Sequence, residues 1–120
     1  MNPPGGVING QSANGLAFAR LLSEYRSGKV TAFICILKAA VGYAWFNKID
    51  ECAYCRLHEG QKFTCPTKET SAKSPHGYVV VYAGPSLPLF VEEFRRWGQV
   101  VVPRNMLHLL PSSTEVGVAL

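Results

Sequence analysis

The segment at residues 30–37 reads VTAFICIL and is almost entirely apolar, with several β-branched and aromatic side chains. Such a run is typical of a strand that is buried on both faces, as in a parallel sheet. A strand of this kind needs helices on both sides of its sheet, and the flanking sequence offers them. The chain is therefore expected to adopt an α/β fold.

The segment at residues 12–28 has the spacing of an amphipathic helix. Ser12 or Asn14 can cap its first turn, and Gly28 lies where such a helix usually stops. One face collects apolar residues at i, i+3, i+4 and i+7: Phe18, Leu21, Leu22 and Tyr25.

The middle of the chain predicts shorter elements. Residues 39–48 suit a short helix, and residues 51–64 suit a strand that turns and returns on itself. Residues 65–77 are polar, lack apolar periodicity and predict a long functional loop. The short helix would bury some combination of Val41, Trp45 and Phe46.

The last part of the chain predicts a strand, a helix and a strand. The strand at residues 78–83 reads YVVVYA, Ser86 is expected to cap the helix, and Gly98 is expected to end it. A short strand follows at residues 99–102, and residues 104–120 are expected to be a partly ordered tail. The apolar face of this helix is formed by Leu87, Phe90, Val91 and Phe94.

Composition narrows the class of protein. The chain has 120 residues, 48% of them hydrophobic, which suits a single globular domain. No apolar run approaches the roughly 20 residues of a membrane span, and no secretory signal is visible, so a cytoplasmic location without a membrane partner is expected. The net charge of +4 mildly favours an anionic partner such as DNA.

The stretch Asn2-Pro3-Pro4-Gly5-Gly6 carries the clearest chemistry. An exocyclic amine is a poor nucleophile because its lone pair is delocalised into the ring. An amide side chain at Asn2 and the carbonyl of Pro3 can both accept hydrogen bonds from such an amine, and consecutive prolines hold the backbone extended. This arrangement favours methyl transfer to a base that has been flipped out of a duplex.

With this motif, the sequence resembles the C-terminal part of phage-type DNA N6-adenine methyltransferases, the Dam-like family. The resemblance covers about residues 2–103 and continues through three further segments. These segments are NGLAFARLLSEYRSGKVTAFICIL, CRLHEGQKF and SPHGYVVVYAGP. It implies a partial Rossmann-like sheet with flanking helices, so that residues 1–103 form the C-terminal half of a methyltransferase-like domain.

The resemblance also implies roles for individual residues. Asn2, Pro3 and Pro4 would be the catalytic loop at the target adenine. Gly5 and Gly6 would lie next to the substrate, although other members have a base-stacking aromatic residue where Gly5 stands. Tyr43 or Trp45 would then supply the stacking ring.

Further substrate contacts are expected from the polar middle of the chain. His76, with Ser74, Pro75 and Gly77, would lie beside the substrate-facing end of the sheet. Three lysines with only Glu69 to offset them would suit DNA phosphates: Lys62, Lys68 and Lys73.

The methyl donor implied by the resemblance is S-adenosylmethionine. Enzymes of this family bind it through a loop after a first strand, and no strand precedes Asn2 in this sequence. The expectation is a truncated or partial enzyme that holds at most part of the donor. Its exposed strand edge would favour self-association or pairing with a missing N-terminal half.

Two alternatives remain open. A zinc-binding module would use Cys52, Cys55 and Cys65 with His58 or His76, because C-x2-C is a metal-knuckle spacing. A non-catalytic DNA-binding remnant would keep the DNA-facing half without donor binding. The fourth cysteine, Cys35, lies in the apolar run and is expected to be a buried core residue.

Overall fold

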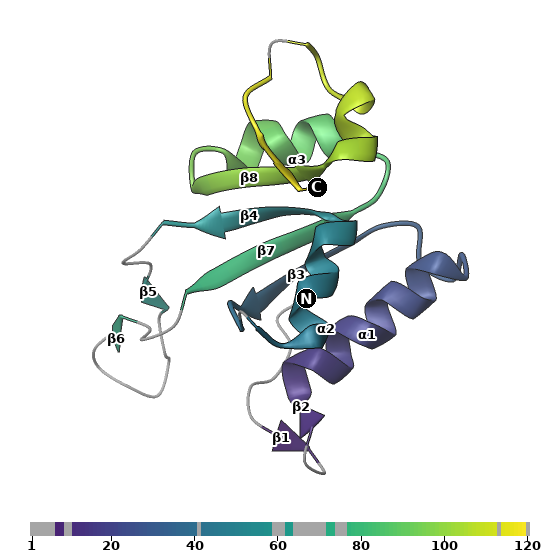
Figure 1. Ribbon diagram of the computed structural model, residues 1–120, viewed down its shortest axis with the longest axis vertical. Helices are drawn as coiled ribbons and strands as arrows, with labels where there is room; N and C mark the ends of the chain where they lie inside the picture. The colour runs from purple at the N-terminus through teal and green to yellow at the C-terminus, as the bar shows by residue number, and fades with distance from the viewer. Residues whose placement is uncertain are drawn as a thin grey trace.

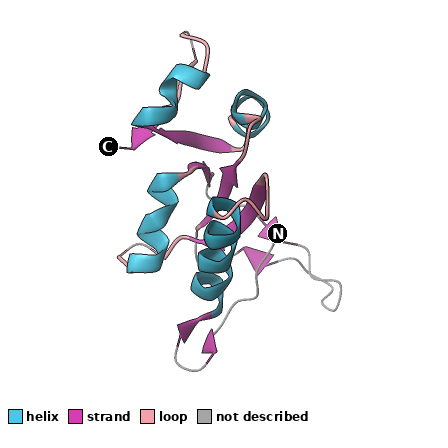
Figure 2. Cartoon of the chain, turned by 90° about the vertical axis from the view of Figure 1, so that its right-hand side faces the viewer, coloured by secondary structure: helices cyan, strands magenta, loops and turns pink. Residues whose placement is uncertain are grey.

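A five-stranded mixed sheet with flanking helices forms the centre of the protein (Figures 1 and 2). The computed structural model describes residues 7–8, 11–40, 42–58, 62–63, 72–73, 77–112 and 114–119. In spatial order, the strands of the sheet are β3 (Phe33–Lys38), β7 (Tyr78–Ala83), β4 (Ala53–Leu57), β8 (Gly98–Pro103) and β9 (Gly117–Ala119).

The sheet contains both parallel and antiparallel strand pairs. β7 pairs antiparallel with both β3 and β4, so β3 and β4 run parallel to each other with β7 between them. β8 is antiparallel to β4, and β9 closes the other side of the sheet in parallel with β8. An α/β fold is therefore confirmed, with a sheet in which antiparallel pairs predominate.

The first helix, α1 (Ala13–Arg26), confirms the helix predicted for residues 12–28. Ser12 is its N-cap: the backbone N–H of Gly15 donates to the Ser12 hydroxyl across 3.2 Å. Gly28 follows the helix with φ of +82°, a left-handed conformation that glycine adopts without strain.

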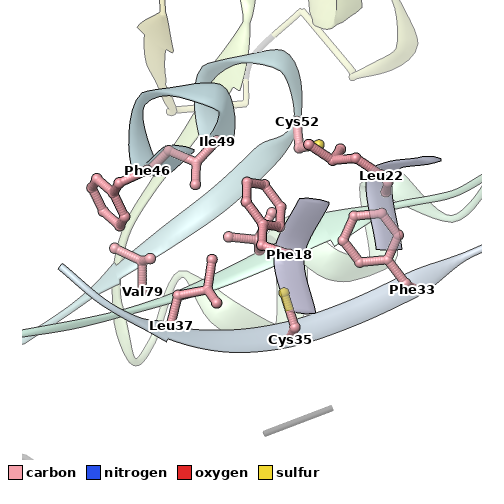
Figure 3. Close-up of a cluster of buried hydrophobic side chains, with 11 residues drawn as sticks. Phe18, Leu22, Phe33, Cys35, Leu37, Phe46, Ile49, Cys52 and Val79 are labelled. Carbon is pink, nitrogen blue, oxygen red and sulfur yellow. The ribbon is translucent and has the colours of Figure 1, made fainter. Parts of the chain in front are cut away.

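One face of the sheet is covered by α1, the short helix α2 (Ala44–Asn47) and the 3-10 turn η1 (Lys48–Glu51). As predicted, Phe18 and Leu22 are buried, and so is Phe46 of α2, whereas Val41 lies outside the described residues. Their common cluster is completed by Phe33, Cys35, Leu37, Ile49, Cys52, Val79, Val81 and Ala83 (Figure 3).

The opposite face carries α3 (Leu87–Phe94) and contacts from the 3-10 segment η2 (Arg104–Leu109). Alternation along β7 sends Val80 to this side while its neighbours face the first cluster. The predicted helix is confirmed and Ser86 is its N-cap residue, as predicted, but the Ser86 side chain makes no capping hydrogen bond. The buried members of this second cluster are Ala53, Cys55, Val80, Leu87, Phe90, Val91, Val100 and Val102.

The strand predicted at residues 30–37 forms, yet its environment differs from the prediction. β3 alternates between buried and more exposed positions, with Ile34 40% exposed, and its neighbour β7 is antiparallel. Both-face burial in a parallel sheet was therefore the wrong expectation. Phe33, Cys35 and Leu37 are buried in the cluster under α1, whereas on the other face Ile36 is only partly buried and Ile34 is exposed.

The predicted return of the chain at residues 51–64 is also wrong. β4 pairs with β7 and β8, whereas β5 (Lys62–Phe63) pairs with β6 (Ala72–Lys73). The two ladders share one register, because Lys62 lies six positions after Arg56 and its partner Lys73 lies six positions before Val79, the partner of Arg56. β5 and β6 therefore have the pairing expected of an extended β4–β7 hairpin.

The ends of the described chain add small elements. β1 (Val7–Ile8) and β2 (Gln11–Ser12) form a two-stranded ladder directly before α1. η2 and β9 occupy much of residues 104–120, and β9 joins the sheet. None of the helices that the structure describes is long and apolar enough to cross a membrane.

Candidate functional site

The predicted catalytic and substrate residues divide into two groups. Asn2, Pro3, Pro4, Gly5, Gly6 and His76 lie outside the described residues. Lys62 and Lys73 belong to β5 and β6, where the register makes them direct cross-strand partners. The geometry around the candidate site therefore comes from the described segments that adjoin these residues.

One end of the sheet brings those adjoining segments together. β3 ends there at Lys38, β4 ends there at Leu57, and β7 begins there at Tyr78, since it runs in the opposite direction. Because β3 and β4 are parallel, this is their shared carboxyl end, and we refer to it as the carboxyl edge. In α/β sheets, ligands bind outside the carboxyl ends of parallel strands.

A buried amide fastens the start of α1 to this edge. The side chain of Asn14 is only 6% exposed, and its Oδ1 accepts a hydrogen bond from the backbone N–H of Lys38 across 3.1 Å. A buried polar group needs such a partner, because leaving it unpaired costs about 1–3 kcal/mol. The helix that follows the Asn2–Gly6 stretch thus starts at the end of β3.

The first turn of α1 also packs closely against Trp45 of α2. A Cβ at Gly15 would lie 2.8 Å from Cγ of Trp45, so only glycine lets the helix approach the indole this closely. Trp45 also meets Phe46 edge to face, with ring centroids 5.8 Å apart. The Trp45 ring is therefore committed to packing.

Tyr43 has the opposite character. It is the N-cap residue of α2 and is 63% exposed. Its backbone is fixed, because its N–H donates to the Ala40 carbonyl and its carbonyl accepts from Phe46, at 3.2 Å and 3.1 Å. Of the two aromatic residues considered for base stacking, Tyr43 offers an available ring and Trp45 does not.

The segment before β7 reaches the carboxyl edge as well. The backbone N–H of Ala39 donates to the carbonyl of Gly77 across 2.9 Å, which joins the residue after β3 to the residue before β7. Gly77 is the described member of the Ser74–Gly77 stretch that was predicted to lie beside the substrate. Gly77 therefore lies at the carboxyl edge, and its role beside a substrate stays a prediction.

Cationic and aromatic side chains continue along this edge onto β4 and β8. Arg56 is exposed, and the backbone N–H of His58 donates to the carbonyl of Trp97 across 3.1 Å. Trp97 is 45% exposed, and the guanidinium of Arg96 lies 5.5 Å from its ring centroid. An exposed arginine beside an aromatic ring is suited to a nucleic-acid backbone and its bases, but here Arg96 already forms an ion pair with Glu93.

The cysteines do not form the predicted metal knuckle. Cys52 lies in the cluster under α1, whereas Cys55 lies in the cluster under α3, on the other face of the sheet. Burial raises the pKa of Cys52 to about 12, and burial raises that of Cys55 to about 11, so both thiols keep their protons. The Cys55 thiol instead donates to the carbonyl of Phe94 across 3.4 Å.

These positions remove the C-x2-C pair from the zinc hypothesis, since the two thiols cannot share one ion from opposite faces. Cys65 lies outside the described residues. Within the part of the chain that the structure describes, no three His, Cys, Asp or Glu side chains gather at a possible metal site. Cys35 is 1% exposed, as expected for a core residue.

Sequence reasoning missed the role of Asn14, which it treated only as a possible cap. The available signal was the asparagine in the first turn of the helix. Asparagine side chains tend to form hydrogen bonds with nearby backbone groups and are less common in helix interiors.

The comparisons with known proteins identify no family: no protein-family model, no curated protein and no solved structure matches this chain.

Proposed function

We propose that the chain is the substrate-facing part of a Rossmann-like, S-adenosylmethionine-dependent DNA N6-adenine methyltransferase. In this proposal Asn2 and the Pro3 carbonyl accept hydrogen bonds from the amine of a flipped-out adenine. Pro4 keeps the loop extended, and Gly5 and Gly6 let the base approach the backbone.

The observation that carries the proposal is the meeting of three segments at the carboxyl edge. The helix following Asn2–Gly6 starts beside the end of β3, through the Asn14 to Lys38 bond. The Gly77 carbonyl is bonded to the residue after β3. The proposal therefore takes the loop ahead of β1, β2 and α1 to act at this end of the sheet, because α/β folds bind ligands outside the carboxyl ends of parallel strands.

The element order supports the same proposal. α1, β3, α2 and β4 follow one another, and the helical segment α2 links β3 to β4, which run in the same direction with the antiparallel β7 between them. The resemblance implied a helix, an apolar strand and a hairpin-like end in this order. The β4–β7 hairpin supplies the last of these.

The exposed ring of Tyr43 completes the proposed base site. It lies on the segment between β3 and α2, close to the carboxyl edge, and offers an aromatic face where the resemblance leaves Gly5 without one. Stacking on an aromatic ring contributes about 1–3 kcal/mol per base.

S-adenosylmethionine supplies the methyl group in this proposal. The described side chains named at the carboxyl edge, those of Asn14, Lys38 and Tyr43, include no carboxylate for its ribose hydroxyls. In the family that the sequence resembles, most of the donor site lies on a strand and loop ahead of the catalytic motif, so the proposal assigns this chain only part of that site.

A DNA-binding remnant without catalysis is the second candidate, and the extended hairpin favours it. Lys62 and Lys73 are Cα partners in the β5–β6 ladder, so the register pairs two lysine positions with each other. A DNA phosphate there would reduce the repulsion between like charges that oppose each other across an antiparallel pair.

The decisive test is recognition of the amine. Fluorescence anisotropy would compare a duplex that has adenine opposite an abasic site with one that has purine there, which lacks only the exocyclic amine. We expect about three- to tenfold tighter binding of adenine, equivalent to one net hydrogen bond. Asn2→Ala should remove this preference, and Asn47→Ala, at the exposed end of α2, should keep it.

Two further measurements complete the test. Tyr43→Ala should weaken both duplexes and Tyr43→Phe should not, because a phenyl ring still stacks. A radioactive methyl-transfer assay with S-adenosylmethionine separates an active enzyme from a remnant. Equal affinity for adenine and purine would contradict the role of Asn2 in either case.

A further inference from the structure

The end of the sheet opposite the carboxyl edge contains a cavity of about 190 Å³. It lies where β7 ends and β4 begins, between α1 on one face and α3 and η2 on the other. Its lining includes Leu22, Tyr25, Cys52, Tyr82, Met106 and Leu109. The proposed methyltransferase chemistry uses none of these six side chains.

The wall of this cavity is apolar and uncharged over most of its extent. Burial raises the pKa of Cys52 to about 12, so its thiol stays neutral at physiological pH. The charged lining residues are Arg26 and Glu51, which are each about half exposed and form an ion pair with each other. Their charges therefore satisfy one another at the rim, and the interior remains suited to an uncharged ligand.

The volume of the cavity limits the size of the ligand that it can hold. An engineered apolar cavity of about 150 Å³ in another protein holds one benzene molecule, so a cavity of about 190 Å³ has room for a single ring with a small substituent. It is too small for a nucleoside or for most drug-sized ligands, whose pockets measure about 300–1,000 Å³.

The wall also favours an aromatic ring over an aliphatic one. Cys52 and Met106 provide sulfur atoms, and sulfur contacts with ring edges stabilise by about 0.3–1.5 kcal/mol. Tyr25 and Tyr82 provide aromatic neighbours for a ring in the cavity. An aliphatic ring of equal size packs against the same wall but lacks the sulfur–aromatic and ring–ring interactions.

We propose that this cavity binds one uncharged, single-ring aromatic group, either a free small molecule or the side chain of a partner peptide. The site is independent of the proposed methyl transfer, since it lies at the other end of the sheet.

The test uses phenol as the free ring and N-acetyl-tyrosinamide as the side chain, with cyclohexanol as the aliphatic control. Each is titrated into the 15N-labelled protein and followed by amide chemical shifts. We expect saturable shifts at residues that line the cavity, such as Ala53 and Ala83, and at least fivefold weaker binding of cyclohexanol than of phenol.

A blocking variant and a matched control complete the design. Leu109→Trp enlarges a lining residue that is 51% exposed, and should weaken phenol binding at least fivefold. Leu89→Trp makes the same change at a 71% exposed leucine that does not line the cavity, and should leave binding unchanged. If Leu109→Trp fails to fold, the shift map of the native chain still decides.

The possible outcomes separate clearly. Binding of phenol alone supports a free small-molecule ligand, and binding of both aromatic probes supports a partner side chain as well. Equal binding of cyclohexanol and phenol would overturn the aromatic assignment. The site itself would be overturned by the absence of saturable shifts at the lining residues, or by Leu109→Trp binding phenol as tightly as the native chain.

Discussion

The two ends of α1 are held by different kinds of interaction. At its first turn, the buried amide of Asn14 accepts a hydrogen bond from the backbone of Lys38. At its last turn, Arg26 forms an ion pair with Glu51, and both side chains are about half exposed to solvent. The first end adjoins the carboxyl edge and the second adjoins the cavity.

The buried hydrogen bond of Asn14 contributes more stability than the exposed ion pair of Arg26. Removing the partner of a buried polar group costs about 1–3 kcal/mol, whereas exposed ion pairs contribute about 0–1 kcal/mol. The hydrogen bond of Asn14 therefore fixes the first turn of the helix more strongly than the ion pair fixes its last turn. At the cavity end it is held mainly by apolar packing, with little contribution from charge.

The largest effect is expected at Gly15. A valine there would collide with the Trp45 ring, because even a Cβ would lie 2.8 Å from its Cγ. Overpacking of this kind costs about 1–3 kcal/mol, and the better helix propensity of valine than of glycine offsets only a small part of that cost, so we expect a loss of about 2.5 kcal/mol in the free energy of unfolding. Urea denaturation measures it.

Ala19→Val is the matched control for this substitution, because Ala19 is exposed on the same helix. It should cost no more than about 0.7 kcal/mol, the difference in helix propensity. Adding Trp45→Leu to Gly15→Val should recover part of the lost stability. If the effects of the two substitutions on the free energy of unfolding were simply additive, the proposed steric contact would be wrong.

The next effect is expected at Asn14. Asn14→Ala leaves the N–H of Lys38 without this acceptor and should cost about 2 kcal/mol in the free energy of unfolding. Hydrogen exchange at the Lys38 amide should accelerate more than exchange in the middle of β7. Unchanged exchange at Lys38 would contradict the bond.

The cavity end should respond to alkaline pH. The pKa of Cys52 rises from 9.0 to about 12, chiefly through burial, with Glu51 and Cys35 raising it further and Arg26 lowering it. Above about pH 9 the unfolded chain loses this proton while the folded chain keeps it. The free energy of unfolding must therefore fall as pH rises from about 9 toward 12.

Cys52→Val isolates this thiol, because valine has a similar volume and does not ionise. Between pH 8 and pH 10 the native chain should lose about 1 kcal/mol more than the variant in urea denaturation. An equal loss in both would show that other groups account for the alkaline transition.

The smallest effect is expected for the exposed ion pair. Arg26→Ala should lower the free energy of unfolding by about 0.5 kcal/mol at low salt, and by less at 1 M salt, where the charges are screened. Glu51→Ala should behave alike. A loss as large as that of Asn14→Ala would reverse the comparison between the two ends of the helix.

Much of the local structure could be predicted from the sequence. The apolar period gave α1 and α3, the β-branched run gave β7, and Ser12 was recognised as a possible cap. These features depend on neighbours within four residues, so they are visible in the chain itself. Ser86 shows the limit, since its residue type suits a cap but its backbone has φ of −106° and ψ of 40°.

The sheet could not be predicted in the same way. The apolar run of β3 did not reveal that its neighbour is the antiparallel β7, more than 40 residues later in the chain. The spacing of Cys52 and Cys55 suggested a shared metal, but the start of β4 places them on opposite faces. Such outcomes depend on which strands pair, and the free energy of pairing comes from residues distant in sequence.

The sequence by itself determined where α1, α3 and the strand β7 form, because periodicity and capping act over a few residues. It also determined the amide and proline chemistry that motivates the proposed function. Only the tertiary structure decided that Asn14 bonds Lys38, that Tyr43 is exposed while Trp45 packs on Gly15, and that a cavity lies at the far end of the sheet. Each of these is a contact between segments whose meeting is set by strand order and the packing of the two clusters.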